Sequence, residues 1–147
     1  MYGTETAANT YFLTKSFDDD NVWADSASDK RLVALNRATI LINRLEFEGD
    51  KTVSTQDDEF PRDGDVVVPV EIEYAAYEIS RELLRGRDPE QEYQLRGSAR
   101  LGLNRVSLES KPGYISEARL HSIPSIIAWD LIKPFLTEGD NINIQRI

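Results

Sequence analysis

The sequence contains no cysteine and only one histidine among its 147 residues. Without cysteine the chain can form no disulfide bond, thiolate metal site or cysteine nucleophile. A hydrolytic triad or a multi-histidine metal centre would have to be built around His121 alone, and the GxSxG, HExxH and phosphate-loop motifs are absent. A lone histidine beside a predicted helix start is more typical of a structural role. We therefore expect no enzymatic activity and no cofactor.

Long apolar runs are missing as well. No stretch approaches the ~20 apolar residues needed to cross a bilayer, and the N-terminal MYGTETAANTYF lacks the basic segment and apolar core of a signal peptide. The expected protein is soluble and unprocessed, has no membrane partner, and is made in the cytoplasm of its host cell. Its length fits a single domain.

Basic residues are few for a chain with this many acidic ones. The sequence has 17 Lys and Arg against 26 Asp and Glu, a formal net charge of −9. Nonspecific nucleic-acid binding relies on a basic surface that releases counterions from phosphate, so this balance argues against it. Arg96, Arg100 and Arg105 with Tyr93 could still form a local strip for single-stranded DNA. One aromatic ring is a weak stacking platform, and a negatively charged partner would explain the strip equally well.

The acidic clusters do not match the pattern of a catalytic or metal site. Counting from Asp18, an EF-hand would place Gly at its sixth position and Glu at its twelfth, where this chain has Trp23 and Asp29. Carboxylate pairs such as Glu71 and Glu73 are common in so acidic a sequence. Nothing marks one of them as buried against an apolar wall, as general-acid chemistry would require. We predict no metal site.

The stretch 59–87 contains the most sharply marked helix. Pro69 suits the first helical position, acidic residues follow in the first turn, and Gly86 can adopt the left-handed conformation that ends a helix. Apolar residues at helical spacing form one face that needs a partner: Ile72, Ala76, Ile79 and Leu83. Before this helix, Phe60 and Pro61 are expected to plug the base of a helix pair, and residues 66–68 to run extended.

Further helices are predicted on either side. A short one covers 4–15 with Thr4 as cap, and a second runs from Ser26 or Ser28 to about Leu45, with Ser26 and Asp29 at capping-box spacing. Between these two helices we expect a loop, held to the body by Trp23. The last helix should start with Ser122 as cap and Pro124 in its first turn, and end at Pro134.

The remaining segments predict a minor β element and a tail. Leu101 and Leu103 alternate with polar residues, and the phase shifts before Val106, which favours a bulge or a hairpin over 101–108. Ile142 and Ile144 alternate in the C-terminal residues, a pattern that suits a strand added to another chain's sheet. The predicted fold is mainly α, a small antiparallel helical bundle in residues 1–139 with an extended tail in 140–147.

One helix face has no explanation within a single chain. In the second helix, aliphatic and basic residues alternate at spacings of three and four, opposite the predicted core face: Lys30, Val33, Arg37, Ile40 and Arg44. This pattern could be a solvated helix surface with flanking core residues, or it could be a contact strip for another subunit.

The order of these features resembles the head-tail adaptor proteins of tailed bacteriophages, including those labelled DnaT-like. The resemblance covers nearly the whole chain and is carried by "NRLEFEG", "FPRDG", "VPVEIEYAAYEISRELL" and "IPSIIAWDLIKPFL". None of these is a catalytic motif, so the similarity bears on architecture more than on any site. The DnaT-like label implies an alternative function, binding of single-stranded DNA during replication.

The resemblance implies a homo-oligomeric ring in the virion, typically a dodecamer, between the portal protein and the tail or the next neck protein. Genomic DNA would pass through its acidic lumen without sequence-specific binding. It further implies that Val33, Arg37, Ile40 and Arg44 contact a neighbouring subunit and that Leu101 and Leu103 pair or project. The C-terminal Ile142, Ile144 and Ile147 would dock on the portal.

Overall fold

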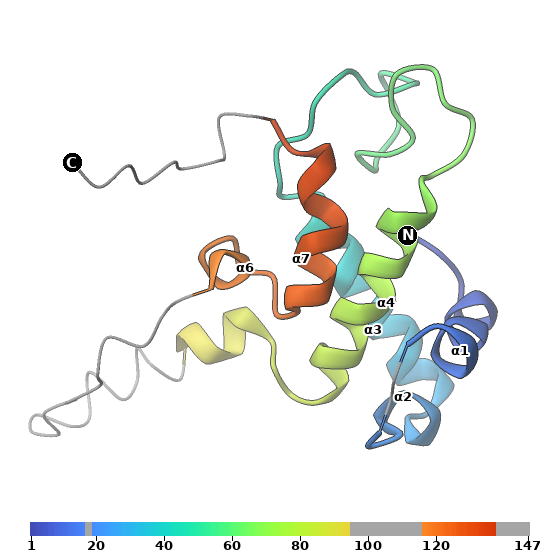
Figure 1. Cartoon of the computed structure of the whole chain (residues 1–147), viewed down its shortest axis with the longest axis vertical. Coiled ribbons are helices and arrows are strands. Elements are labelled where there is room, and N and C mark those ends of the chain that lie inside the picture. Colours follow the sequence, from blue (N-terminus) through green and yellow to red (C-terminus); the bar gives the residue numbers. More distant parts are fainter. Residues whose placement is uncertain (17–18, 95–115, 138–147) are drawn as a thin grey trace, which may run out of the picture.

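A computed structural model describes residues 1–16, 19–94 and 116–137, and this part of the chain is mainly helical, as predicted (Figure 1). Residues 89–94 are also helical. Within the described ranges there is no strand, and two isolated bridges pair Phe47 with Leu136 and Lys51 with Arg62. The predicted β element at 101–108 and tail at 140–147 lie outside these ranges. The named helices are α1 (Glu5–Thr14), α2 (Val22–Asp25), α3 (Ser28–Ile42), α4 (Val70–Leu84), α6 (Glu117–Leu120), α7 (Ile126–Ile132) and the 3₁₀ helix η1 (Lys133–Phe135).

Helix α4 is central, with α7 on one side and α1 and α2 on the other (Figure 1). Its predicted apolar face is confirmed for Ile72, Ala76 and Ile79, which are fully buried, while Leu83 is partly buried against the core. Each large apolar side chain buried in such a core contributes roughly 1.5–3 kcal/mol. The core joins α3, α4 and α7 to the loop between α3 and α4 through Leu41, Ile42, Phe60, Ile72, Ile79, Trp129 and Ile132.

The ends of α4 follow local sequence signals closely. Pro69 is the N-cap and not the first helical residue, because its ψ of 137° is extended and its carbonyl accepts hydrogen bonds from the amides of Ile72 and Glu73. At the other end Gly86 has a φ of +82°, and the amide of Arg87 donates to the carbonyl of Glu82. The predicted left-handed glycine is therefore confirmed.

The second helix does begin at Ser28, one of the two predicted starts, but the predicted Ser26 cap was wrong. Helix α3 follows Ala27 without a side-chain cap, since the Ser26 hydroxyl donates instead to the carbonyl of Val22. Residues 22–25, predicted as loop, form α2, and Ser26 terminates it. Trp23 is buried as expected, and its indole N–H donates to the side chain of Asn9 at 2.8 Å.

The N-terminal helix agrees with its prediction. Helix α1 begins at Glu5, and the Thr4 hydroxyl accepts a hydrogen bond from the amide of Ala7 at 3.1 Å. Before the helix, Gly3 has a φ of +74° and packs so closely on Tyr77 that an added Cβ would lie 2.3 Å from the Tyr77 hydroxyl. A residue with a side chain would be strained there in both respects.

The helix caps near the end of the described chain differ from the predicted ones. Ser122 is not a helix cap, because it has a φ of 60° in the turn after α6. Ser125 caps α7 by accepting from the amide of Ala128, so Pro124 precedes the helix instead of lying in its first turn. The predicted end near Pro134 is confirmed, because α7 ends at Ile132 and the chain continues as the 3₁₀ helix η1, which contains Pro134.

A buried polar cluster fastens α1 to α4. Glu78 is fully buried and accepts hydrogen bonds from the Tyr11 hydroxyl at 2.8 Å, from the Ser16 hydroxyl and from the Arg81 guanidinium. Burial, followed by the bond to Glu78, raises the pKa of the Tyr11 hydroxyl. Asp20, in the acidic run, forms a two-point contact with Arg85 at 2.7 and 2.8 Å. These contacts connect the N-terminal segment to the central helix.

Candidate functional site

The outer face of α3 carries exposed aliphatic and basic side chains in one line. Val33 is 65% exposed and Ile40 is 47% exposed, on the side of the helix opposite the buried Leu35 and Ile42. We call the line Lys30, Val33, Arg37 and Ile40, together with Arg44 in the turn just after the helix, the α3 strip. Its surface position is confirmed. Its role as a subunit contact stays a prediction, although aligned aliphatic side chains in water mark a candidate interface.

Two of the basic residues in the α3 strip differ in their surroundings. Arg37 pairs within the chain, with Glu90 at 2.5 Å and Asp88 at 3.4 Å. Burial lowers the pKa of Arg37, but the hydrogen bonds to Glu90 and Asp88 outweigh it and raise the pKa above its ordinary value. Arg44 is exposed and forms no hydrogen bond or ion pair with any residue that the structure describes. Arg44 is therefore an available cation of the strip, as is Lys30, which is exposed and whose ammonium is in no ion pair with the described residues.

A groove of about 330 Å³ lies between α1 and α4. Small side chains of α1 form one wall together with Tyr11 and Lys15, and a valine, a glutamate and tyrosines on α4 form the other. We call it the α1–α4 groove. Its main lining residues are Ala7, Thr10, Thr14, Val70, Glu73 and Tyr74.

Glu73 is the notable polar group of the α1–α4 groove. Its carboxylate forms no hydrogen bond or ion pair within the described part of the chain, and burial raises its pKa. The rings of Tyr11 and Tyr74 lie 4.6 Å apart between their centroids, and the Lys15 ammonium lies over the Tyr74 ring at 5.9 Å. An aromatic wall beside an uncompensated carboxylate favours a cationic side chain as ligand.

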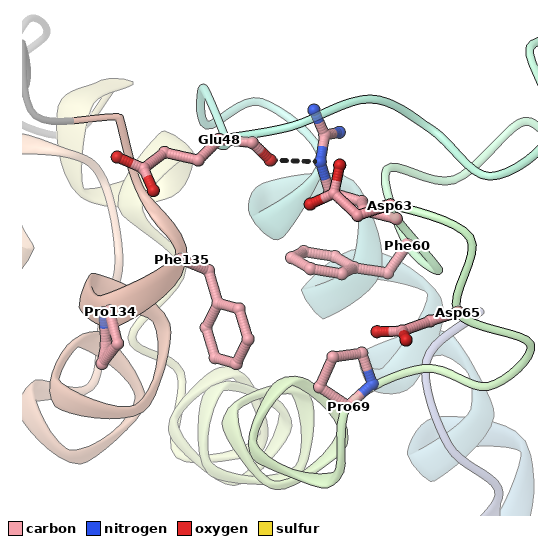
Figure 2. A pocket seen from close by; sticks show the side chains of 8 residues that line it. Glu48, Phe60, Asp63, Asp65, Pro69, Pro134 and Phe135 are labelled. Atoms are coloured by element: carbon pink, nitrogen blue, oxygen red, sulfur yellow. Dashed lines mark hydrogen bonds between the residues drawn. The ribbon is translucent and has the colours of Figure 1, made fainter.

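A second pocket, of about 190 Å³, lies between the α3–α4 loop, the start of α4 and η1 (Figure 2). Phe60, Phe135 and the ring of Pro69 point into it, Pro134 lines it from η1, and Asp63 and Asp65 lie along its loop side (Figure 2). The expected plug is confirmed, since Phe60 is buried against Phe47, Tyr2 and Phe135.

The polar groups of this second pocket serve to hold the loop. The Arg62 guanidinium donates to the carbonyl of Glu48 at 2.8 Å, to that of Phe47 at 3.2 Å and to that of Gly49, and it pairs with the Glu59 carboxylate at 2.7 Å. Asp63 accepts from the amide of Asp50 at 2.9 Å. The pocket therefore offers no free acid and base in contact. Its neighbour, the run 66–68, forms no strand, and Val66 and Val67 are exposed.

His121 is stacked on Trp129, with ring centroids 4.6 Å apart and planes 13° from parallel. Next to it, Glu117 accepts hydrogen bonds from the Trp129 indole at 3.2 Å and from Lys133 at 3.3 Å. The Trp129 bond is the main cause of the lowered pKa of Glu117. These contacts join α6 to α7, which supports a structural role for the histidine.

No group of His, Asp or Glu in ranges 1–16, 19–94 and 116–137 could hold a metal ion, and no helix there is long and apolar enough to span a bilayer. The sequence did not reveal the α1–α4 groove, although Tyr74 and Tyr77 sit at helical spacing off the Ile72–Leu83 face, where they join a second core cluster with Tyr11. It also did not reveal that Ile126 and Ile127 at the start of α7, with Leu120 on α6, are exposed.

Several predicted site residues lie outside the described part of the chain. They are the subunit contacts Leu101 and Leu103, the portal contacts Ile142, Ile144 and Ile147, and the arginines Arg96, Arg100 and Arg105. The aromatic member of the DNA strip, Tyr93, is described and exposed.

Comparison with known proteins adds no relative. No protein-family profile, no curated protein and no solved structure matches the chain. The functional argument therefore rests on the surfaces described above.

Proposed function

We propose that this protein is a structural head-tail adaptor of a tailed bacteriophage, which forms a ring between the portal and the tail and lets DNA pass. The α3 strip is the observation that carries the proposal, because Val33 and Ile40 are exposed on an otherwise well-packed helix and the free cation Arg44 follows in the turn after its end. A monomer gains nothing from aliphatic side chains in water at this spacing, whereas a repeated subunit contact would bury them.

The proposed architecture is a small antiparallel bundle around α4, with a β-hairpin over 101–108 and an extended C-terminal tail. The bundle supplies a rigid body, and the arms would bridge to other proteins. The last described residues fit this role, since the bridge of Leu136 to Phe47 fastens the chain to the body just before the tail begins. The acidic balance suits a DNA channel because like charges keep phosphate from adhering.

Truncation after Gly139 tests portal docking. The shortened chain should keep the helical circular dichroism of the full chain, because it retains every core residue that the structure describes, up to Leu136. It should fail to co-sediment with the portal protein of the same phage. A full-length control with Ile142, Ile144 and Ile147 changed to Ser keeps the tail but removes its apolar side chains, and it should also fail. Unimpaired binding of both variants would refute the role of the tail, and purified virions that lack the protein would refute the function.

Single-stranded DNA binding is the second candidate, favoured by exposed Tyr93 beside the arginine-rich segment. It predicts an oligonucleotide gel shift at low salt that weakens as salt increases. Changing Arg96, Arg100 and Arg105 to Ala should then abolish the shift. The adaptor proposal expects no such shift with the unaltered protein.

A further inference from the structure

The α3 strip and the α1–α4 groove are complementary surfaces on one chain. Val33 and Ile40 lie two helical turns apart, about 10 Å along α3. The groove walls repeat over a similar length, from Ala7 to Thr14 on α1 and from Val70 to Tyr77 on α4. The small side chains of Ala7 and Thr10 would let a third helix approach the groove closely.

Charge complementarity points in the same direction. Arg44 has no ionic partner among the described residues, and Glu73 has no hydrogen-bond donor or counter-charge there. Burial of Glu73 without a partner is unfavourable, and a guanidinium is the group that best compensates a carboxylate. The tyrosine rings beside Glu73 add a favourable surface for a cation.

The pocket at the α3–α4 loop is a weaker receptor for the same strip. Its Arg62 brings a positive charge that already pairs with Glu59, and Asp63 already accepts from the amide of Asp50. The carboxylates of Glu48 and Asp65, which also line this pocket, are exposed to solvent, whereas the unpaired Glu73 carboxylate of the groove is half-buried. The groove's one cation, Lys15, lies over the Tyr74 ring, and no ion pair of the described chain joins it to Glu73.

We propose that the α1–α4 groove receives the α3 strip of a second copy of this chain, with Arg44 of one copy paired to Glu73 of the next. The proposal rests on the self-association included in the proposed function and names the two surfaces that meet. Because the strip and the groove are different surfaces, the contact is head-to-tail. Repetition of such a contact generates a closed ring when the rotation between copies allows it, and a filament otherwise.

Charge reversal in the full chain tests the pairing. Arg44→Glu and Glu73→Arg should each weaken self-association at least about tenfold in sedimentation equilibrium, and the double variant should recover to within about threefold of the unaltered chain. Arg119→Glu makes the same charge change at an exposed residue of α6 whose ion pair is with Glu92, so it serves as the control and should leave assembly unchanged. Circular dichroism checks folding, and Glu73→Gln provides a gentler change should Glu73→Arg fail to fold.

Cysteine cross-linking gives an independent readout because the chain has no cysteine. Arg44→Cys mixed with Glu73→Cys should form a disulfide-linked dimer on mild oxidation, while neither variant alone should do so. Assembly that is unaffected by either reversal, with no mixed cross-link, would overturn the strip-in-groove contact and leave the adaptor ring standing. Loss of assembly with Glu73→Arg alone would show that another partner occupies the groove. An unaltered chain that stays monomeric, alone and with portal protein, would overturn both proposals.

Discussion

Substitution of the buried pair Glu78 and Arg81 tests most directly what holds α1 to α4. Glu78 has no exposed surface and Arg81 is 5% exposed, and the two side chains pair one turn apart on α4. Glu78 also accepts from Tyr11 on α1 and from Ser16 just after it. A change at Glu78 therefore disturbs contacts between two helices and leaves a buried guanidinium without this carboxylate.

Glu78→Leu should be strongly destabilising for that reason. Removal of one partner from a buried ion pair typically costs about 3–5 kcal/mol, a large share of the ~5–15 kcal/mol by which domains of this kind are stable. At roughly 2–4 °C per kcal/mol the midpoint of thermal unfolding should fall by about 10 °C. The double variant Glu78→Leu with Arg81→Met should recover much of the loss, because an apolar pair of similar volume can replace a buried ion pair at little cost.

Urea unfolding of the two single variants and the double variant, followed by circular dichroism, measures the coupling free energy directly. Glu78→Gln is the matched control, since it retains a hydrogen-bond acceptor for Tyr11 and should lose less stability than Glu78→Leu. A Glu78→Leu variant within about 0.5 kcal/mol of the unaltered chain, the range of ordinary surface changes, would refute the reasoning. Strict additivity in the double variant would show that the two side chains act separately.

Two further predictions concern the N-terminal segment. Gly3→Ala should lower the midpoint of thermal unfolding more than Gly64→Ala. Both glycines have positive φ, but a Cβ at Gly3 would meet the Tyr77 ring, whereas a Cβ at Gly64 would meet nothing within 4 Å. Equal losses in the two variants would contradict the packing argument. Burial opposes ionisation of Asp58, but hydrogen bonds from the N-terminal ammonium at 2.7 Å and from Asn43 at 2.8 Å outweigh it and hold the pKa of Asp58 below its ordinary 3.8. Asp58 should therefore stabilise the fold above pH 3.8 and lose this effect as the pH falls through its lower folded-state pKa. Urea titrations should show a smaller loss of stability over that range for Asp58→Asn, and an unchanged acid profile would contradict the assignment.

The parts of the fold that the sequence predicts are those governed by neighbouring residues. Helix α4 combines strong helix formers, a marked start at Pro69 and a terminating Gly86, so its bounds could be read almost to the residue. The caps near α7 were harder, because Ser122 and Ser125 are both suitable residues. Only the packing of the turn after α6 decides that Ser125 serves as the cap.

The α3–α4 loop could not be predicted, because its organisation depends on one side chain and several distant carbonyls. Arg62 reaches the backbone at Phe47, Glu48 and Gly49, and no periodic pattern in the sequence records such contacts. The candidate surface divides in the same way. The exposure of Val33 and Ile40 follows from helical spacing, whereas the α1–α4 groove exists only where two helices meet.

The Glu73 carboxylate should have opposite effects on the stability of the monomer and on the proposed self-association. Because burial raises its pKa above the ordinary 4.5, folding favours the protonated form, and the charged form destabilises the folded monomer at neutral pH. Stability should thus increase as the pH falls through the raised pKa. Glu73→Gln removes this effect, so the monomer should unfold at a slightly higher temperature at pH 7 while its self-association weakens. If Glu73 had a merely structural role, Glu73→Gln would lower both the thermal midpoint of the monomer and its self-association. A monomer made less stable by Glu73→Gln would show that Glu73 is compensated within its own chain.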